Sequence, residues 1–453
     1  MAEMAFHHAL KIHDDLCIGC THCIKSCPTE ALRVKGGKAH LIPERCVDCG
    51  ECMRVCPVNA ITVEEDDFSR IFEYETRVAL VPSVFIGQFP RNIATRKIYS
   101  GILEEGFTHV IEVEHGAGLL IELINEYLAS PATVRPVISS FCPAIVRLIQ
   151  VRFPSLVSHI MPLKAPLDLT SIFYRQKLND QGIDTTKTGI FYITPCAAKI
   201  AAVKSPVGEK SSAIDGVINL KTLFSKVYSV IRREEKGYCI VPEKEQLLPE
   251  EMAWTLTGGE ARHVKGRCLA VDGISNAIEF LEKLENGTLG NFDFLEMRAC
   301  DEGCAGGILS AANRFLVSER LYTRVNQYYS DRDSGKLINN KSIDGYRDYV
   351  IGHSSLGDIE PRSIMKLDDD MVQAMKKMEK IRKITAVLPG IDCGACGSPS
   401  CRTLAEDVVQ RRAHTTDCVF VNMKVKGGEG MKQAVDHSEL IWGKNRFRNM
   451  LPE

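Results

Sequence analysis

The sequence lacks the features that would indicate a membrane span, secretion or nucleic-acid binding. Nowhere in its 453 residues do eighteen apolar residues follow one another without interruption, and the start, MAEMAFHHALKIHDD, has no charged segment followed by an apolar one. Lysine and arginine number 56 against 58 acidic residues, so no cationic excess favours nucleic acid. We expect a cytoplasmic protein with no membrane span. Its length and 45% apolar content predict two or three domains with a large core.

Cysteine is the residue in excess. The chain contains 18 cysteines and shows no secretion signal. Because the cytosol keeps thiols reduced, this number indicates metal ligation or redox chemistry more than disulfides.

The one internal repeat is a cysteine motif, CIGCTHCIKSCP at 17–28 and CVDCGECMRVCP at 46–57. In each copy three close thiolates hold one iron-sulfur cube, and the cysteine before proline crosses to the other cube. The predicted 4Fe-4S ligand sets are Cys17, Cys20, Cys23 and Cys56, and Cys46, Cys49, Cys52 and Cys27. Two zinc knuckles are the alternative, which the third cysteine and the C-P endings disfavour. Residues 1–70 are therefore predicted to form an α+β ferredoxin-like domain, with a hairpin turning at Gly36-Gly37.

A second cysteine group lies near the C-terminus, in LPGIDCGACGSPSCRTLAEDVVQRRAHTTDCVF. Cys393, Cys396 and Cys401 surround a glycine-rich turn, and the segment RTLAEDVVQRR predicts a helix that returns Cys418 to them. Four thiolates suffice for one cube, and zinc stays open because no C-P ending is present. The segment resembles the small iron-sulfur domain of corrinoid iron-sulfur proteins and of some membrane electron-transfer subunits.

A connecting helix is predicted before this group, in DDDMVQAMKKMEKIRKI. Its apolar residues are Met371, Val372, Met375 and Met378. Residues 366–453 are thus predicted as a linker helix followed by a small helical iron-sulfur domain.

The middle of the chain, from about Arg77 to Tyr349, has few cysteines and an α/β pattern. The predicted strands are RVALVPSVFI, THVIEVEHG, RPVISSFCP, TGIFYITPC and FDFLEMRAC, and the predicted helices include LLIELINEYL and AIVRLIQVRF. Ligands of α/β sheets gather beyond the carboxyl ends of the strands, where Cys142, Cys196 and Cys300 fall, with Cys304 four residues later. Buried structural thiols are the alternative for these four. They are the preferred interpretation of two others, Cys239 and Cys268.

The segments SSFCP, TPCAAK and MRACDEGCAGG, with LVPSVF upstream, resemble the signature segments of the FeFe-hydrogenases, the iron-only hydrogenase large subunits. The resemblance spans nearly the whole chain, because many members carry a ferredoxin-like domain first. It implies an α/β catalytic domain at 71–365 that holds an H-cluster. This cofactor is a 4Fe-4S cube joined through one thiolate to a two-iron unit with CO, cyanide and a bridging azadithiolate.

The resemblance also implies residue roles. The ligands of the cube would be Cys142, Cys196, Cys300 and Cys304, with Cys304 bridging to the two-iron unit. Lys199 would donate hydrogen bonds to a cyanide, and an ammonium suits an anionic ligand in a dry pocket. Pro82, Ser83 and Ser140 would line the pocket.

Three departures from the common catalytic members carry information. Phe141 stands where those members have a proton-donor cysteine, and a phenyl ring cannot carry a proton, so Ser140 or a water would have to substitute. Arg298 replaces an expected methionine, with Met297 one position earlier, and the later glycine run is shortened to AGGILS. With the C-terminal four-cysteine domain, these features resemble the sensory hydrogenases. The better-known sensory group adds a PAS domain, which does not follow here, so a signal is expected to pass to another protein.

Three functions stay open: a slow hydrogenase that senses hydrogen or redox state, a turnover hydrogenase with an altered proton path coupled to ferredoxin, and a non-catalytic protein like the hydrogenase-related iron-sulfur assembly factors. Lys199 and the pocket residues favour the first two. Expected partners are H2, protons, a ferredoxin or signalling protein, and hydrogenase maturation proteins, and a homodimer is one option. Four 4Fe-4S clusters would commit sixteen of the 18 cysteines.

Overall fold

The computed structural model describes residues 6–233, 247–333, 342–362, 367–368, 370–426 and, near the C-terminus, 433, 436–437 and 440–441. Cys239 lies outside the described residues. The chain forms two compact units, one made of Met1–Glu64 with Arg362–Glu453 and the other of Glu65–Pro361. The two end segments, predicted as separate domains, therefore belong to one unit. Within the described ranges, every helix is too short or too polar to cross a lipid bilayer.

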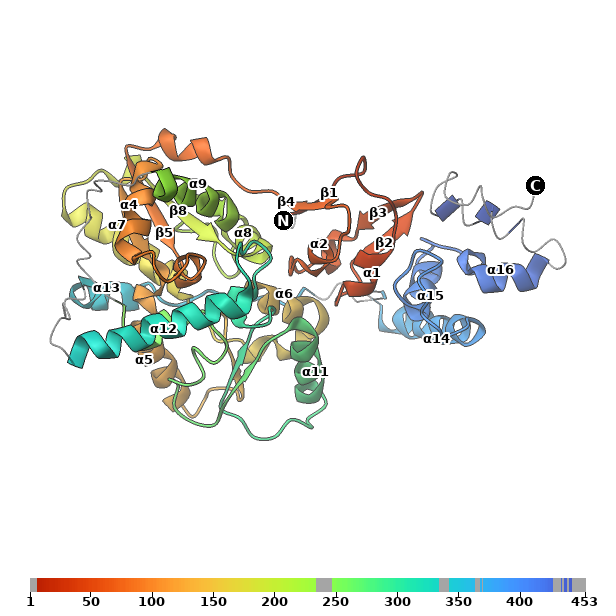
Figure 1. The fold of residues 1–453 in the computed structure, drawn as a ribbon. Helices are drawn as coiled ribbons and strands as arrows, with labels where there is room; N and C mark the ends of the chain where they lie inside the picture. The colour runs from red at the N-terminus through yellow and green to blue at the C-terminus, as the bar shows by residue number, and fades with distance from the viewer. Residues whose placement is uncertain are drawn as a thin grey trace. The chain divides into compact units, whose positions relative to one another are not determined.

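Two parallel sheets form the centre of the second unit (Figure 1). The larger has the order β6-β5-β8-β9, with β5 at Thr76–Val81, β6 at His109–Glu112, β8 at Thr188–Thr194 and β9 at Gly216–Asn219. The smaller has the order β10-β11-β7, with β10 at Cys268–Val271, β11 at Phe294–Met297 and β7 at Val137–Ile138. Every residue of β8 is buried, as expected for a parallel strand covered on both faces. The α/β class and the five predicted strands are confirmed, whereas β9 and β10 were not predicted.

Helices connect and cover these strands. The longer ones are α4 at Thr95–Glu104, α5 at Ala117–Ala129, α6 at Pro143–Arg152, α7 at Pro166–Asp180, α8 at Ala197–Lys204, α9 at Leu220–Arg233, α11 at Ile274–Glu285 and α12 at Arg314–Asp333. The short ones are α3 at Ser83–Ile86, α10 at Pro249–Met252 and α13 at Arg347–Gly352. The two predicted helices are confirmed as α5 and α6. The first predicted strand ends early, because Pro82 follows Val81 and α3 begins at Ser83.

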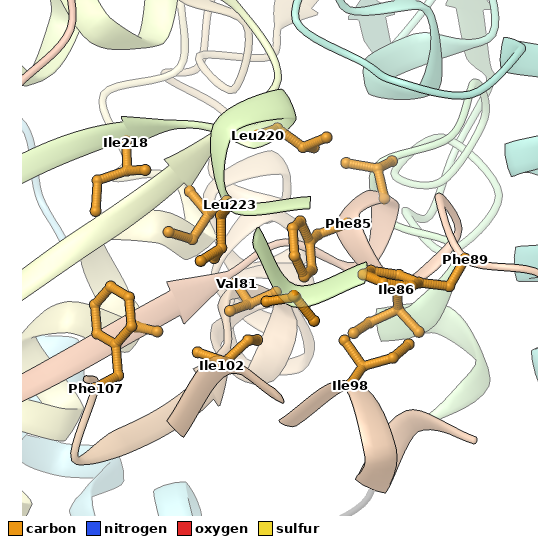
Figure 2. Packing of buried hydrophobic residues seen from close by; sticks show 14 of the residues in the cluster. Val81, Phe85, Ile86, Phe89, Ile98, Ile102, Phe107, Ile218, Leu220 and Leu223 are labelled. Atoms are coloured by element: carbon orange, nitrogen blue, oxygen red, sulfur yellow. The ribbon is translucent and has the colours of Figure 1, made fainter. Parts of the chain in front are cut away.

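One core cluster of this unit lies where α4 and α9 pack on the larger sheet. Figure 2 shows the side chains of Val81, Phe85, Ile102, Ile218 and Leu223 converging from β5, α3, α4, β9 and α9. Burying each such side chain stabilises the fold by about 1.5–3 kcal/mol. Cys304 packs against the edge of this cluster, so the core supports one of the predicted ligands.

The first unit begins with the ferredoxin-like repeat. β1 at Leu10–Ile12 pairs antiparallel with β4 at Ile61–Val63, and β2 at Leu32–Lys35 with β3 at Lys38–Leu41. Helices α1 at His22–Ser26 and α2 at Glu51–Arg54 occupy equivalent places in the two copies of the motif. The predicted hairpin is confirmed. Its turn uses Gly36 and Gly37, both with positive φ angles that favour glycine.

The C-terminal part of this unit is helical, with α14 at Met371–Val387, α15 at Cys401–Val409 and α16 at Val419–Lys426. The two predicted helices are confirmed as α14 and α15. They pack together through buried residues that include Ile381, Leu388 and Leu404. The apolar residues predicted for the connecting helix do not form this contact, because Met371, Val372, Met375 and Met378 are 55% to 75% exposed.

Candidate functional site

The first predicted ligand set surrounds one small cavity. Its lining includes Cys17, Cys20, Cys23 and Cys56, with Val34 and Ala39 among the apolar wall residues. The backbone N–H of Ala60 donates to Cys56 Sγ at 3.2 Å, which favours a thiolate there. Burial, followed by the neighbouring Cys20 and Cys17, raises the pKa of Cys23 to about 12. Thiolates so close together need a central positive charge, which the irons of a cluster supply.

The second predicted set repeats this arrangement. Ala31 N–H donates to Cys27 Sγ at 3.2 Å, the counterpart of the Ala60 bond. Burial raises the pKa of Cys49, and Cys27 is the largest neighbouring cause. Burial also raises the pKa of Cys52, and Cys49, Cys27 and Cys23 add to the rise. Burial and then Asp48 raise the pKa of Cys46, with smaller contributions from Cys49 and Cys52, so the four thiols are electrostatic neighbours.

One carboxylate supports this second set. The Asp48 backbone N–H donates to Cys46 Sγ at 3.4 Å, and the Asp48 carboxylate accepts from His8 Nδ1 at 2.9 Å and from Ala9 N–H at 3.0 Å. His8, Cys46 and Asp48 lie close enough for a metal ion to bridge them, but these hydrogen bonds explain their proximity.

The C-terminal cysteines also enclose a single cavity. Cys393, Cys396, Cys401 and Cys418 all line it. Burial raises the pKa of Cys396 to about 11, with Cys393 and Cys418 adding to the effect. Asp392 fixes the loop by accepting the backbone N–H of Cys401 at 2.6 Å. Four thiols in this arrangement fit a 4Fe-4S cluster and would also fit zinc.

In the second unit, the predicted catalytic thiols stand at strand ends. Cys142 follows β7 and caps α6, Cys196 follows β8 and caps α8, and Cys300 follows β11. Cys304 lies in the 3-10 turn Gly303–Gly306, and its backbone N–H donates to Thr255 O at 2.8 Å. β7 and β11 are neighbours in the smaller sheet, whereas β8 belongs to the larger one. The strand ends that carry these thiols therefore come from two parallel sheets and not from the edge of a single sheet.

Electrostatic contacts show which of these groups are neighbours. Burial raises the pKa of Cys196 to about 12, Lys199 opposes the rise, and Cys304 and Cys142 add to it. Burial likewise raises the pKa of Cys304, against Lys199 and Arg298. Three of the four thiols and two buried cations therefore share one environment. The donor set fits the cluster that the resemblance implies, because thiolates and anionic ligands are stabilised by buried positive charge.

The ring of Phe141 contacts both buried cations, Lys199 and Arg298. The ring is 2% exposed, Lys199 Nζ is 4.0 Å from its centroid, and Arg298 Cζ is 3.8 Å from it. Trp254 contacts the same ring edge to face at 6.2 Å. Cation–π contacts of this kind are strongest when desolvated, as they are here. Phe141 thus contacts two positive groups beside the thiols.

Arg298 is held by a buried acidic frame that the sequence did not reveal. Its guanidinium donates to Glu260 Oε1 at 2.8 Å, to Glu296 Oε1 at 3.2 Å and to Trp254 O at 3.2 Å. Burial alone would lower the pKa of Arg298, but Glu260 and Glu296 raise it, followed by the thiols. Arg298 Nη1 is buried and has no hydrogen-bond partner among the described residues. One donor beside the thiols is therefore available to a ligand.

The predicted pocket residues differ in what their polar groups do. Pro82 caps α3, and Ser83 begins it at the end of β5. Ser83 N–H donates to both carboxyl oxygens of Glu114, at 2.9 and 3.0 Å. Ser140 Oγ donates to Leu163 O at 2.6 Å, so its proton already has an acceptor in the protein.

Glu114 is a buried acid that sequence reasoning missed. Burial, followed by Glu112, raises the pKa of Glu114 to about 8. Ser83 Oγ joins it to Thr255 Oγ1 at 2.9 Å, and Thr255 O accepts from the Cys304 backbone. The position of Glu114 at the end of β6, in THVIEVEHG, was the signal that could have identified it.

A second acid lies on a cavity of about 90 Å³ whose lining includes Ser140, Phe141, Lys199 and Asp168. Burial, followed by Glu209, raises the pKa of Asp168 to about 6. Cys268, interpreted from the sequence as a structural thiol, lies in β10, and its thiol donates to Val264 O at 3.4 Å.

The model of the iron only hydrogenase large subunit, C-terminal domain, matches residues 76–236 and 238–308, a little over half of the chain. The chain belongs to the iron-only hydrogenase family. A 4Fe-4S dicluster domain model matches residues 10–63, and a model of an Fe-S cluster domain matches residues 388–420. The family recognised from the cysteine segments is thus confirmed, together with its iron-sulfur domains.

Individual relatives are more distant. The chain is 25% identical over 200 residues to the NADP-reducing hydrogenase subunit HndD of Solidesulfovibrio fructosivorans, an alignment that covers 42% of this chain and 31% of HndD. The matched region is therefore about a third of that relative. Among solved structures, that of the FeFe-hydrogenase HydA(deltaEFG) is 15% identical to this chain, with a TM-score of 0.46. The match covers 66% of this chain and 97% of the HydA chain. A HydA1 variant from Chlamydomonas reinhardtii is 14% identical with a TM-score of 0.45 and the same coverage.

Proposed function

We propose that the protein is a FeFe-hydrogenase that interconverts H2 with protons and electrons at an H-cluster held by Cys142, Cys196, Cys300 and Cys304. When bound, this cluster supplies the metal centre at which H2 is cleaved or formed. The observation that carries the proposal is the shared environment of Cys142, Cys196 and Cys304 with the buried Lys199. Structural thiols would not need a buried ammonium beside them.

The residues around these thiols have separate tasks in this proposal. Cys304 would hold the cube and the two-iron unit together, and Lys199 would donate hydrogen bonds to a cyanide. Pro82, Ser83 and Ser140 line the pocket. Arg298 adds a second fixed cation with one unused donor, which suits an anionic cofactor.

We further propose that turnover is slow and that the protein reports hydrogen or redox state. Phe141 cannot carry a proton, and the Ser140 hydroxyl donates to Leu163 O. A positioned acid or base typically contributes about 10²–10⁴-fold to a rate, so its loss leaves water or a remote group to deliver protons. A sensor needs occupancy of a state more than flux, and slow chemistry is compatible with that.

A turnover hydrogenase with a different proton path is the second candidate. The observation in its favour is the buried chain Glu114, Ser83 and Thr255, which reaches the backbone of Cys304. A non-catalytic assembly-type protein is the third candidate, and two buried cations beside the thiols argue against it.

The cysteine count gives the number of proposed clusters, and the proposed partners follow from the hydrogenase activity. Residues 1–70 would hold two 4Fe-4S clusters, residues 366–453 one, and residues 71–365 the fourth within the H-cluster. Electrons would pass to a ferredoxin or to a signalling protein in the cytoplasm, and hydrogenase maturation proteins would insert the two-iron unit. A homodimer remains one option for the assembly.

Isotope exchange tests the proposed activity without assuming a redox partner. Matured protein under D2 in H2O should release HD, measured by mass spectrometry, because D2 cleavage and proton exchange need no external acceptor. Matured Cys304→Ala protein is the control and should release none. Absence of HD from wild-type protein that contains all of its iron would contradict the proposed activity.

A further inference from the structure

Within the first unit, the C-terminal domain is joined to the ferredoxin-like domain by buried ion pairs. Arg33 of β2 contacts Asp407 of α15 at 2.5 Å, and both side chains are buried. Arg45, next to the predicted ligand Cys46, contacts Glu406 at 3.1 Å. Removing one partner of a buried pair leaves an uncompensated charge, which is strongly destabilising. The two domains are therefore held in one fixed arrangement.

The same surface brings the loops of two predicted clusters into backbone contact. Val34 lines the cavity of Cys17, Cys20, Cys23 and Cys56, and its N–H donates to Gly397 O at 2.8 Å. Gly397 directly follows Cys396 of the C-terminal set. A Cβ on Gly397 would lie 2.0 Å from Val34 O, so only glycine allows this approach.

Other contacts lie on the same surface. Gly37 N–H donates to Ile441 O at 2.5 Å, and within the ferredoxin-like domain a Cβ on Gly19, between Cys17 and Cys20, would lie 2.7 Å from Gly37 O. Lys25 of α1 donates to Pro399 O at 3.4 Å. A Cβ on Gly394, beside Cys393, would lie 3.0 Å from the Lys25 side chain. The two domains thus meet through glycines, backbone atoms and the Lys25 side chain.

We propose that this contact is an electron-transfer junction between the C-terminal cluster and the ferredoxin cluster of Cys17, Cys20, Cys23 and Cys56. One electron leaves a reduced 4Fe-4S cluster and reduces the other, with an external redox protein as the donor or final acceptor. Cys393 is exposed, so the C-terminal cluster is the member of the pair that such a protein can approach. The inference rests on the proposed iron-sulfur content of both domains, and it does not require the H-cluster.

The second ferredoxin cluster is a weaker candidate for this exchange. Its links to the C-terminal domain run through side chains: Arg45 contacts Glu406, and Glu30, three residues after Cys27, accepts hydrogen bonds from Ser400 Oγ at 3.0 Å and Thr403 Oγ1 at 2.6 Å. The link at Val34 and Gly397 is a direct backbone hydrogen bond. Val34 lines the first cavity, and Gly397 stands in the chain between Cys396 and Ser398, which line the other.

A matched pair of glycine variants tests the junction. Gly397→Ala places a methyl group against Val34, whereas Gly390→Ala meets nothing within 4 Å, and both residues have similar positive φ angles of 80° and 67°. The two variants share the backbone strain, and only the first disturbs the junction. In fully reduced protein, electron paramagnetic resonance should show spin coupling between the C-terminal cluster and the ferredoxin cluster of Cys17, Cys20, Cys23 and Cys56, both in wild type and in Gly390→Ala. The coupling should be lost in Gly397→Ala at unchanged iron content.

A second variant keeps the test decisive if Gly397→Ala does not fold. Cys401→Ser removes a ligand of the C-terminal cluster and should abolish the coupling while the ferredoxin signals persist. Uncoupled signals in wild-type protein with all clusters present would overturn the junction, and so would zinc in the C-terminal site. Neither result affects the infrared bands of CO and cyanide, which test the hydrogenase proposal. Missing bands with intact coupling would remove the hydrogenase proposal alone.

Discussion

The guanidinium carbon of Arg298 lies 3.8 Å from the centre of the Phe141 ring. Lys199 approaches the same ring at 4.0 Å, so one aromatic side chain contacts both cations beside the proposed cluster ligands. Phe141 therefore contacts the two cations and also fills apolar volume in the site. Its substitution tests proton delivery and charge placement together.

Phe141→Cys should raise hydrogen turnover without changing the cluster content. A thiol in this position can receive and donate protons, which the ring cannot. We expect a gain of about tenfold, below the usual range of about 10²–10⁴ for a positioned acid, because the thiol also loses the contacts to Arg298 and Lys199. The measurement is the H2 evolution rate of matured protein with an artificial electron donor.

Phe141→Leu is the matched control, since it removes the ring and supplies no proton. It should show no gain. An unchanged rate in the cysteine variant, with unchanged spectrum and iron content, would place the slow step elsewhere in the mechanism.

Arg298→Met should lower the stability of the second unit and the reduction potential of the catalytic cube. The substitution leaves the buried Glu260 and Glu296 without their cation, which costs about 3–5 kcal/mol. Loss of a positive charge near Cys304 also disfavours added electrons. Thermal unfolding and a redox titration followed by electron paramagnetic resonance measure the two effects. An unchanged potential would show that the charge of Arg298 does not act on the cluster.

Glu114→Gln should remove a pH dependence of stability. The folded-state pKa of Glu114 is about 8, above the ordinary value of 4.5, so the native state retains a proton that the unfolded state loses. This group therefore favours the folded state fully below about pH 4.5, and its effect declines as the pH rises to about 8. The decline has a slope of up to about 1.4 kcal/mol per pH unit.

Denaturant titrations between pH 5 and pH 8 measure this slope in wild type and variant. The variant should lose less stability over this range than wild type. Equal slopes would mean that Glu114 ionises normally, and the chain through Ser83 would lose its support as a proton path.

Reconstituted protein should contain about sixteen iron atoms per chain before the two-iron unit is added, four in each of four cubes. The measurement is metal analysis together with iron-bound sulfide. A value near eight iron atoms with zinc present would contradict the C-terminal and catalytic assignments. In that case only the two ferredoxin clusters would remain.

The sequence was most informative where chemistry depends on spacing along the chain. The repeated cysteine motif predicted two ligand sets; the structure places the thiols of one set around one cavity and those of the other in one electrostatic group. Strand ends in the middle of the chain likewise indicated Cys142, Cys196 and Cys300, because a strand followed by a thiol and a helix is a local pattern. Helix α15 was predicted by its periodicity for the same reason.

Contacts between residues far apart in the chain could not be predicted from the sequence. Glu260, Glu296 and Arg298 form one buried group only after β11 and the loop beyond α10 have packed together, and no local pattern marks Glu260 as buried. The contact between Val34 and Gly397 joins residues from opposite ends of the chain. The connecting helix was predicted correctly as α14, but its apolar residues Met371, Val372, Met375 and Met378 are exposed, and periodicity alone does not show whether a partner element covers them.

Infrared spectroscopy of the matured protein tests the central claim most directly, because CO and cyanide bound to iron absorb where protein does not. The account predicts bands from both ligands in wild type. It predicts their loss in Cys304→Ala with the ferredoxin clusters intact, and a weaker effect in Lys199→Ala, which removes hydrogen bonds and no iron ligand. Wild-type protein that holds all four cubes, has been exposed to the maturation proteins and shows no such bands would contradict the assignment of a hydrogenase active site.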